Sequence, residues 1–246
     1  MSRSKTAMIV VMLFCVLCFA FVAFYFLVIN KSAVAEKPDD KETAILKVAG
    51  LYESGKSERE VQSLYQARIT PVTVDLDSGK NVPRASDKCV ALARNDDPAE
   101  IRKRCATEEI FIVQDAQHRI EQVIVPIKGQ GAKGMMQGLV ALEPDGRTVK
   151  SIRYYDLKET PELGGKVQEE AWTRQWVGKK LVDDEGKPVF KVLPPSQAQD
   201  AHSVDGITGA TMTSNGVQNS VNYWMGERGF GPFLARLRNG ELSSLN

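Results

Sequence analysis

The chain has 246 residues and nearly balanced charge, with 32 Lys and Arg residues against 31 Asp and Glu residues. The sequence contains no basic stripe and no interleaving of aromatic and basic residues, which argues against a nucleic-acid partner. The length beyond the first 30 residues is enough for one substantial hydrophobic core.

The N-terminal segment predicts a transmembrane helix. Residues 7–29 carry no charge, and this run is long enough to cross a bilayer core of about 30 Å at about 1.5 Å per residue. Arg3 and Lys5 precede it, so the positive bias places the N-terminus in the cytoplasm and the remainder outside. A cleaved signal peptide is the alternative, because Ala33-Val34-Ala35 offers a cleavage site. Secretory apolar segments, however, span only about 7 to 15 residues.

The chain therefore divides into a cytoplasmic tip and transmembrane helix (1–30), a linker (31–41) and an exported domain (42–246). Two helices are predicted at the start of the domain. The first spans about 42–51, and the second opens with Ser57 and Glu60, which have the spacing of a capping box.

The four cysteines fall into two pairs. Cys15 and Cys18 lie one helical turn apart in the predicted span. They could ligate a metal shared with partner subunits, although cysteines in membrane helices are more often packing residues. Cys89 and Cys105 are the only cysteines in the exported part. An outside location permits a disulfide between them, worth roughly 3 kcal/mol on the chain-entropy model, and two free thiols are the alternative.

The middle of the chain predicts an antiparallel sheet. Strand patterns cover residues 70–76, 110–113, 119–127, 138–142 and 148–155. Pro144-Asp145-Gly146 is a turn signal between the last two, because proline presets φ and glycine tolerates positive φ. Helical patterns lie at both ends and around 167–176. The expected class is α+β, an antiparallel sheet with flanking helices, preceded by one N-terminal transmembrane helix.

A constrained loop and a glycine-rich turn stand out after the strands. The loop is Glu159-Thr160-Pro161-Glu162-Leu163-Gly164-Gly165, which in isolation is an ordinary strand-to-helix connection. The turn is Asp205-Gly206-Ile207-Thr208-Gly209-Ala210-Thr211, and a helical spacing of apolar residues follows it. The N-terminal end of a helix attracts phosphate. From the residues alone, the simpler interpretation of the turn is a threonine N-cap.

The turn nevertheless resembles the Asp-x-x-Ser/Thr-Gly-Ala-Thr signature of FMN-binding domains, in which the last threonine is esterified to the flavin phosphate. The resemblance makes Thr211 the acceptor, with Thr208, Gly209 and Ala210 matching the rest of the signature. Asp205 matches the acidic position that resembles the recognition element for a Mg-dependent flavin transferase. Thr213 lies outside the match.

The loop resembles the Glu-Thr-Pro-Gly-Leu-Gly motif that lines the flavin ring in the same family. Glu159 opens this motif and belongs to the predicted cofactor-binding set. Thr160 and Leu163 match as ring contacts, and Gly164 matches as a point of close backbone approach.

Residues 126–142 and the C-terminal Gly229-Phe230-Gly231-Pro232-Phe233-Leu234 extend the likeness. With these segments nearly the whole chain resembles the C-subunit family of the sodium-translocating NADH:quinone oxidoreductases. The resemblance implies an electron-transfer flavoprotein of the bacterial inner membrane with a periplasmic main domain, catalytically incomplete alone. Its complex would couple NADH oxidation and ubiquinone reduction to sodium export. The implied partners are the other subunits, and a flavin transferase during maturation.

Two other functions remain open. The corresponding flavoprotein subunit of the related ferredoxin:NAD electron-transport complex has the same anchor and threonine-linked flavin. A flavin-free, membrane-anchored scaffold or binding protein would need Thr211 only as a helix cap.

The chain departs from the family pattern at two places. Ala132 and Lys133 stand where the family usually has a bulky pair, and Glu162 replaces a glycine. We hypothesise that a carboxylate at Glu162 disfavours reduced, anionic flavin and lowers the flavin potential.

Overall fold

The computed structural model describes residues 40–117 and 119–241. The helices are α2 (Lys41–Val48), α3 (Glu58–Arg68), η1 (Arg94–Asp96), η2 (Gly164–Gln168), α4 (Glu170–Thr173), η3 (Arg174–Trp176), α5 (Thr211–Met225) and α6 (Gly231–Arg238). The strands are β1 (Ile69–Asp75), β2 (Cys89–Ala91), β3 (Lys103–Cys105), β4 (Thr107–Gln114), β5 (Ile120–Gln130), β6 (Met135–Leu142), β7 (Val149–Asp156), β8 (Lys191–Leu193) and β9 (Ser203–Asp205).

Five strands form the central sheet in the order β1-β4-β5-β6-β7, and every neighbouring pair is antiparallel. The turn between β6 and β7 is closed by Asp145, whose carboxylate accepts hydrogen bonds from the backbone amides of Arg147 and Thr148. Gly146 in this turn has φ of 64°, a conformation that glycine adopts without steric cost. The α+β class and the antiparallel sheet with flanking helices are thereby confirmed.

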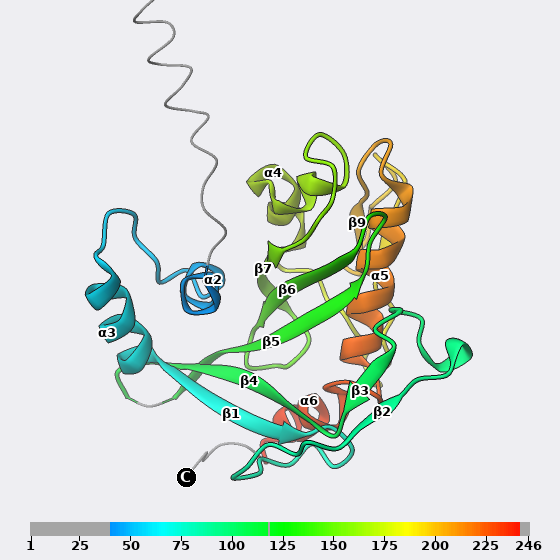
Figure 1. The fold of residues 1–246 in the computed structure, drawn as a ribbon. Helices are drawn as coiled ribbons and strands as arrows, with labels where there is room; N and C mark the ends of the chain where they lie inside the picture. Colours follow the sequence, from blue (N-terminus) through cyan, green and yellow to red (C-terminus); the bar gives the residue numbers. More distant parts are fainter. Residues whose placement is uncertain (1–39, 118, 242–246) are drawn as a thin grey trace, which may run out of the picture. The chain divides into compact units, whose positions relative to one another are not determined.

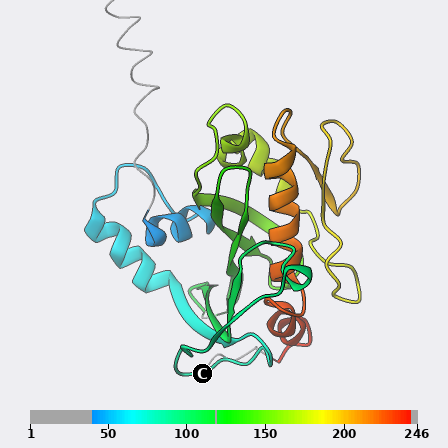
Figure 2. The ribbon, with the colours of Figure 1, turned by 45° about the vertical axis from the view of Figure 1, so that its right-hand side comes forward.

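Helices cover both faces of this sheet. Along β5, Val123, Val125 and Ile127 belong to the larger hydrophobic cluster, which also includes Val217 and Val221 of α5. Ile124 points to the smaller cluster on the opposite face, with Ile45 of α2. Figures 1 and 2 show α2 and α5 on opposite sides of the strands. Because both faces are buried, β5 reads in the sequence as a continuous apolar run instead of an alternating one.

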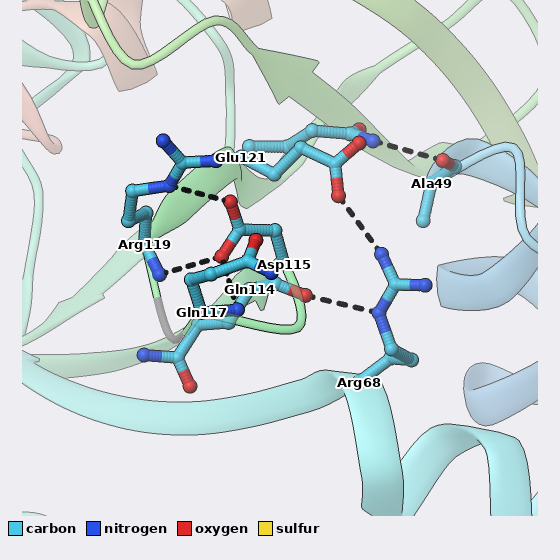
Figure 3. A network of polar contacts seen from close by, with 8 residues as sticks. Ala49, Arg68, Gln114, Asp115, Gln117, Arg119 and Glu121 are labelled. Atoms are coloured by element: carbon cyan, nitrogen blue, oxygen red, sulfur yellow. Dashed lines mark hydrogen bonds and ion pairs between the residues drawn. The ribbon is translucent and has the colours of Figure 1, made fainter.

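The end of α3 is attached to the β4–β5 hairpin by a polar network (Figure 3). Arg68 donates from Nε to the carbonyl of Gln114 (2.9 Å) and from Nη2 to the Glu121 carboxylate (2.8 Å). Within the hairpin turn, the backbone amide of Arg119 donates to Asp115 and is the main cause that holds the pKa of this carboxyl below its usual value. The capping box of Ser57 and Glu60 begins α3, as predicted.

Two expectations need correction, and one pair of strands was not expected. The helical pattern around 167–176 is not one helix but the three short helices η2, α4 and η3, since the segment is too short to propagate a regular helix by itself. Helix α2 begins at Lys41, inside the predicted linker, because the Asp40 carboxylate caps the amide of Thr43. The parallel pair β8–β9 was not predicted.

The predicted transmembrane helix, together with Cys15 and Cys18, lies outside the described residues. Within residues 40–117 and 119–241, no helix has the length and apolar character needed to cross a bilayer.

Candidate functional site

The glycine-rich turn leads directly into α5. Gly209 has φ of 77°, the left-handed conformation that favours glycine. Ser214, in the first turn of α5, accepts a hydrogen bond at Oγ from the amide of Ile207 (3.2 Å) and donates its own amide to the carbonyl of Ala210 (2.9 Å). The turn is therefore held in place by the helix that it begins.

The N-terminal end of α5 carries no side-chain cap. Within the described part of the chain, the backbone amides of Thr211, Met212 and Thr213 meet no hydrogen-bond acceptor. Unpaired amides and the helix dipole together create a positive potential that suits an anion. Thr211 therefore does not behave as the N-cap that the residues alone suggested.

The three threonines of this segment have different surroundings. Thr208 and Thr211 are exposed, and no described residue hydrogen-bonds to either hydroxyl. Thr213 is buried, with 1% of its surface exposed. It donates its hydroxyl proton to Oε2 of Glu159 over 2.6 Å. Only the first two hydroxyls are free to react with a reagent from solvent.

Glu159 joins the two motifs. One oxygen of its carboxylate accepts from Thr213 of α5, and the other accepts from the backbone amide of Lys133 (2.9 Å) at the tip of the β5–β6 hairpin. A Cβ atom added at Gly164 would collide with both the Glu159 carboxylate and the Thr213 hydroxyl. The glycine of the loop is thus required by this contact.

Helix α5 lies directly on β5 through glycines. A Cβ at Gly216 would collide with the carbonyl of Gln130, and one at Gly129 would lie 2.5 Å from Cβ of Ser220. Gly131 leaves room in the same way for the Glu159 carboxylate. At these glycine positions helix and strand approach too closely for a larger residue, so the start of α5 is fixed relative to the sheet.

Two exposed apolar side chains, Leu163 and Met212, lie at the turn. Leu163 approaches the turn closely, since an added Cβ on Gly209 would lie 3.2 Å from Leu163 Cδ2. Leu163 is 42% exposed and Met212 is 68% exposed, so both side chains are accessible to a ligand. The loop and the turn, separated by more than 40 residues in sequence, therefore meet in space.

A pocket of about 230 Å³ opens beside the turn. It is lined by Val192, Leu193, Pro194, Pro195, Gly206, Ile207, Thr208, Gly209, Thr211, Ser214 and Asn215. The predicted cofactor residues divide between this pocket and the loop: Thr208, Gly209 and Thr211 line the pocket, whereas Glu159 and Leu163 belong to the loop beside it. Thr160 shapes that loop, because its carbonyl accepts from the amides of Leu163 and Gly165.

Asp205 has a structural task. Its carboxylate accepts hydrogen bonds from the amides of Gln197 and Ala198, each over 2.9 Å. Its carbonyl accepts from the indole of Trp172 (2.8 Å). Asp205 therefore connects the loop before β9 with α4. Its recognition by a flavin transferase stays a prediction.

The remaining candidate residues do not line the pocket beside the turn. Cys89 and Cys105 form a disulfide between β2 and β3. Ala132 and Lys133 are exposed at the tip of the β5–β6 hairpin, and Glu162 is exposed in the loop. Among the residues described, no group of three or more His, Cys, Asp or Glu side chains is arranged to hold a metal.

The sequence interpretation missed the bond between Thr213 and Glu159. The signal that could have found it is the spacing of small residues, since Gly131, Gly164 and Gly216 all leave space around this carboxylate or this helix. Each glycine alone resembles an ordinary loop or helix residue.

The matches to known proteins include the loop 159–165 and the turn 205–211. The FMN-binding domain family matches residues 131–226, which contain both the loop and the turn. The chain is 42% identical over 256 residues to the C-subunit of the Na(+)-translocating NADH-quinone reductase of Yersinia pestis, covering 99% of this chain and 96% of that relative. It is 40% identical over 217 residues to the protein of that name from Vibrio alginolyticus, covering 83% of each. The crystal structure of Shewanella oneidensis NqrC superposes with a TM-score of 0.74 at 30% identity, covering 84% of this chain and 100% of that one.

Proposed function

Because this chain belongs to the C-subunit family of the Na(+)-translocating NADH-quinone reductases, we propose that it carries FMN as a phosphodiester on Thr211. As a flavoprotein subunit of that reductase, it uses the bound flavin to accept and donate electrons. The observation that carries the proposal is the exposed Thr211 hydroxyl at the uncapped N-terminal end of α5.

The surroundings of the threonines favour Thr211 as the attachment site. Thr213 is buried and already bonded to Glu159, so its esterification would break a buried contact. Thr208 is exposed but precedes the helix, whereas Thr211 is its first residue. A phosphodiester on Thr211 leaves one negative charge next to unpaired backbone amides. The partial positive charges of these amides offset it.

The neighbouring loop supplies the other contacts that we propose for the flavin. Leu163 offers an apolar surface to the ring, Thr160 a hydrogen-bonding group, and Gly164 space for close approach. The pocket beside Thr211 measures about 230 Å³, less than the roughly 300 to 1,000 Å³ typical of sites that enclose a drug-sized ligand. We infer that it takes only part of the cofactor and that the rest lies on the protein surface.

FMN supplies reversible electron uptake and release, and the protein supplies attachment, orientation and electrostatics. A covalent tether avoids loss of the carrier between turnovers. In this proposal the electrons pass between other subunits of the complex, and the assembled complex couples NADH oxidation and ubiquinone reduction to sodium export.

The chain is further proposed to span the bacterial inner membrane once, with the main domain in the periplasm. The uncharged run 7–29 and the preceding Arg3 and Lys5 support this orientation. The disulfide between Cys89 and Cys105 is in keeping with an oxidising compartment.

The test is the intact mass of the denatured full-length chain after coexpression with a flavin transferase. We expect an added mass of FMN less one water in the native chain and in Thr213→Ala, and none in Thr211→Ala. An adduct that survives in Thr211→Ala but disappears in Thr208→Ala would move the attachment site to Thr208. Absence of any adduct, when a known acceptor protein is labelled in parallel, would favour the flavin-free scaffold.

The subunits that copurify distinguish the two flavoprotein alternatives. Recovery with the sodium-translocating reductase supports the proposal, whereas recovery with the ferredoxin:NAD complex would contradict it.

A further inference from the structure

Residues 89–105 form an arm that the proposed flavin site does not use. The arm consists of β2, η1, β3 and the loops between them, and the disulfide between Cys89 and Cys105 closes its base. Figure 1 shows it extending away from the strands of the central sheet. The carbonyl of Ala99 in the arm accepts a hydrogen bond from the amide of Gln130 at the end of β5 (2.9 Å).

The backbone of the arm is firmly held. Asp97, only 6% exposed, accepts hydrogen bonds from the amides of Ile101 (2.9 Å) and Arg102 (2.6 Å). Glu100 and Arg102 have φ of 54° and 64°, a conformation that costs a residue other than glycine on the order of 1 kcal/mol. Buried Ala99 and Ile101 anchor the loop in the main hydrophobic cluster. The arm thus presents its exposed side chains from a fixed backbone.

The charges of the arm are unbalanced. Arg104 pairs with Asp77 (2.7 Å), and Asp96 pairs with Arg228 (3.3 Å). In the described part of the chain, the exposed side chains of Arg94, Arg102 and Lys103 have no such partner. Two carboxylates of the arm also lack a cationic partner: Glu100, which is exposed, and Asp97, which is buried and accepts hydrogen bonds from backbone amides. Among these unpaired groups three cations and one carboxylate are exposed, so the accessible surface of the arm is positive on a chain that is almost neutral overall.

Two of these cations line a hollow built by the arm itself. Its volume is about 430 Å³, and its walls are Leu92, Arg94, Asp97, Pro98, Glu100 and Arg102. The carboxylate of Asp97 is held by backbone amides, whereas that of Glu100 is exposed. Leu92 and Pro98 provide apolar surface next to the guanidinium groups. Val90, on β2, is 59% exposed. An occupant that satisfies this surface combines carboxylate groups with short apolar side chains.

We propose that the arm is a docking surface for an acidic segment of a partner protein, with Arg94 and Arg102 receiving its carboxylates. The planar guanidinium group binds a carboxylate through two parallel hydrogen bonds, which requires a defined orientation. A held backbone and a shaped hollow provide that orientation. Binding to anionic lipid requires only positive charge near the surface, so a lipid would make no use of the held backbone and the shaped hollow. This inference rests on the family membership of the chain, which supplies partner subunits, and not on the flavin.

The direct test places the photoreactive amino acid p-benzoylphenylalanine at Arg94 in the full-length chain, coexpressed with the other subunits of the reductase. We expect, after irradiation, a crosslink to one subunit within a peptide that contains Asp or Glu. Crosslinks only to lipid, or no crosslink above that from the same substitution at Arg84, would overturn the proposal.

Charge reversal provides the matched comparison. Arg94→Glu with Arg102→Glu should lower the amount of partner subunits that copurify with the chain by about tenfold. The difference in copurification between the wild type and this double variant should shrink at high salt, because salt screens the charges. Arg59→Glu with Arg84→Glu changes charge equally at exposed positions elsewhere and should leave copurification unchanged. Equal losses in both double variants would contradict a specific surface.

Folding and flavin attachment are followed in the same samples by thermal unfolding and intact mass. A native melting temperature and a full FMN adduct, together with lost copurification, identify a docking defect. If the chain carries no FMN but still crosslinks at Arg94, the proposed cofactor fails while the docking surface stands.

Discussion

At the residue scale, Glu159 is the group whose surroundings are most tightly determined. It accepts hydrogen bonds from Thr213 and from the amide of Lys133, and two glycines leave room for it. A partly buried polar network of this kind is stable only when each member is satisfied. The orientation of the first turn of α5 therefore depends on a residue more than 50 positions earlier in the chain.

Gly164→Ala is predicted to break this arrangement. The new methyl group would collide with Glu159 and Thr213, so we expect a loss of about 1 to 3 kcal/mol in the free energy of unfolding, measured in urea. The extent of FMN attachment, measured by intact mass, should fall as well. Gly134→Ala is the control, because its Cβ meets only the Lys158 side chain at 3.8 Å. Equal stability of the two variants would show that the contact is dispensable.

Glu162→Gln is predicted to raise the midpoint potential of the bound flavin. The substitution removes one negative charge from the loop that carries Leu163, and a nearby negative charge opposes the reduced, anionic flavin. Because Glu162 is exposed, the difference should shrink as salt is added. Redox titration at low and high ionic strength is the measurement. An unchanged midpoint at low salt would refute the hypothesis.

A short motif singles out a residue but does not test its role, so the assignments of Thr211 and Leu163 to the flavin stay predictions. Thr211 and Leu163 each stand in a contiguous pattern, and the structure brings their segments together at Gly209. The partner of Thr213 was not predictable, because nothing local links it to Glu159. The carboxylate of Asp205 was assigned only to recognition by a transferase, although it also holds the amides of Gln197 and Ala198.

At the element scale, the β6–β7 hairpin depends on Asp145. Burial tends to raise the pKa of its carboxyl, but hydrogen bonds from Thr148 and Arg147 outweigh that effect and hold the pKa below its ordinary value. A depressed pKa in the folded state means that the carboxylate stabilises the fold above the unfolded pKa of about 3.9. This contribution is lost as pH falls through the folded pKa.

Asp145→Asn should therefore lower the free energy of unfolding by about 1 kcal/mol near neutral pH, through weaker hydrogen bonds in the turn. The difference from wild type should shrink as the solution is acidified below about pH 4. Urea unfolding at a series of pH values measures it. If the difference in the free energy of unfolding between wild type and Asp145→Asn stays constant down to roughly pH 2.5, the effect comes from packing and not from the charge of Asp145.

The strands were more predictable than the short helices. Each long strand of the central sheet has at least a run of apolar or alternating residues, and the turn at Asp145 has its own local signal. The strands β2, β3, β8 and β9 have three residues each, too few to show a period. The pair β2–β3 depends on a disulfide, which the sequence permitted but did not require.

At the scale of the whole molecule, residues 40–117 and 119–241 have their own sheet and two hydrophobic clusters. The proposal that a single N-terminal helix retains them at the membrane is separable from the fold. Intact mass of the purified full-length chain should include residues 1–35. A mass that begins after Ala35 would identify a cleaved signal peptide.

The proposed orientation predicts that proteinase K degrades the main domain in spheroplasts but not in intact cells. The positive residues before the uncharged run are the reason for this direction. A cytoplasmic protein serves as the control for lysis. Protection of the domain in spheroplasts would contradict this orientation and place the main domain in the cytoplasm.

The glycine contact between α5 and β5 has a kinetic meaning for the proposed carrier. Gly129 and Gly216 allow helix and strand to approach closely, so the attachment residue cannot swing like a cofactor on a long lysine arm. The gap over which an electron tunnels to its donor or acceptor then changes only when the whole domain moves. Transfer rates should accordingly follow the viscosity of the medium more closely than the flexibility of any side chain.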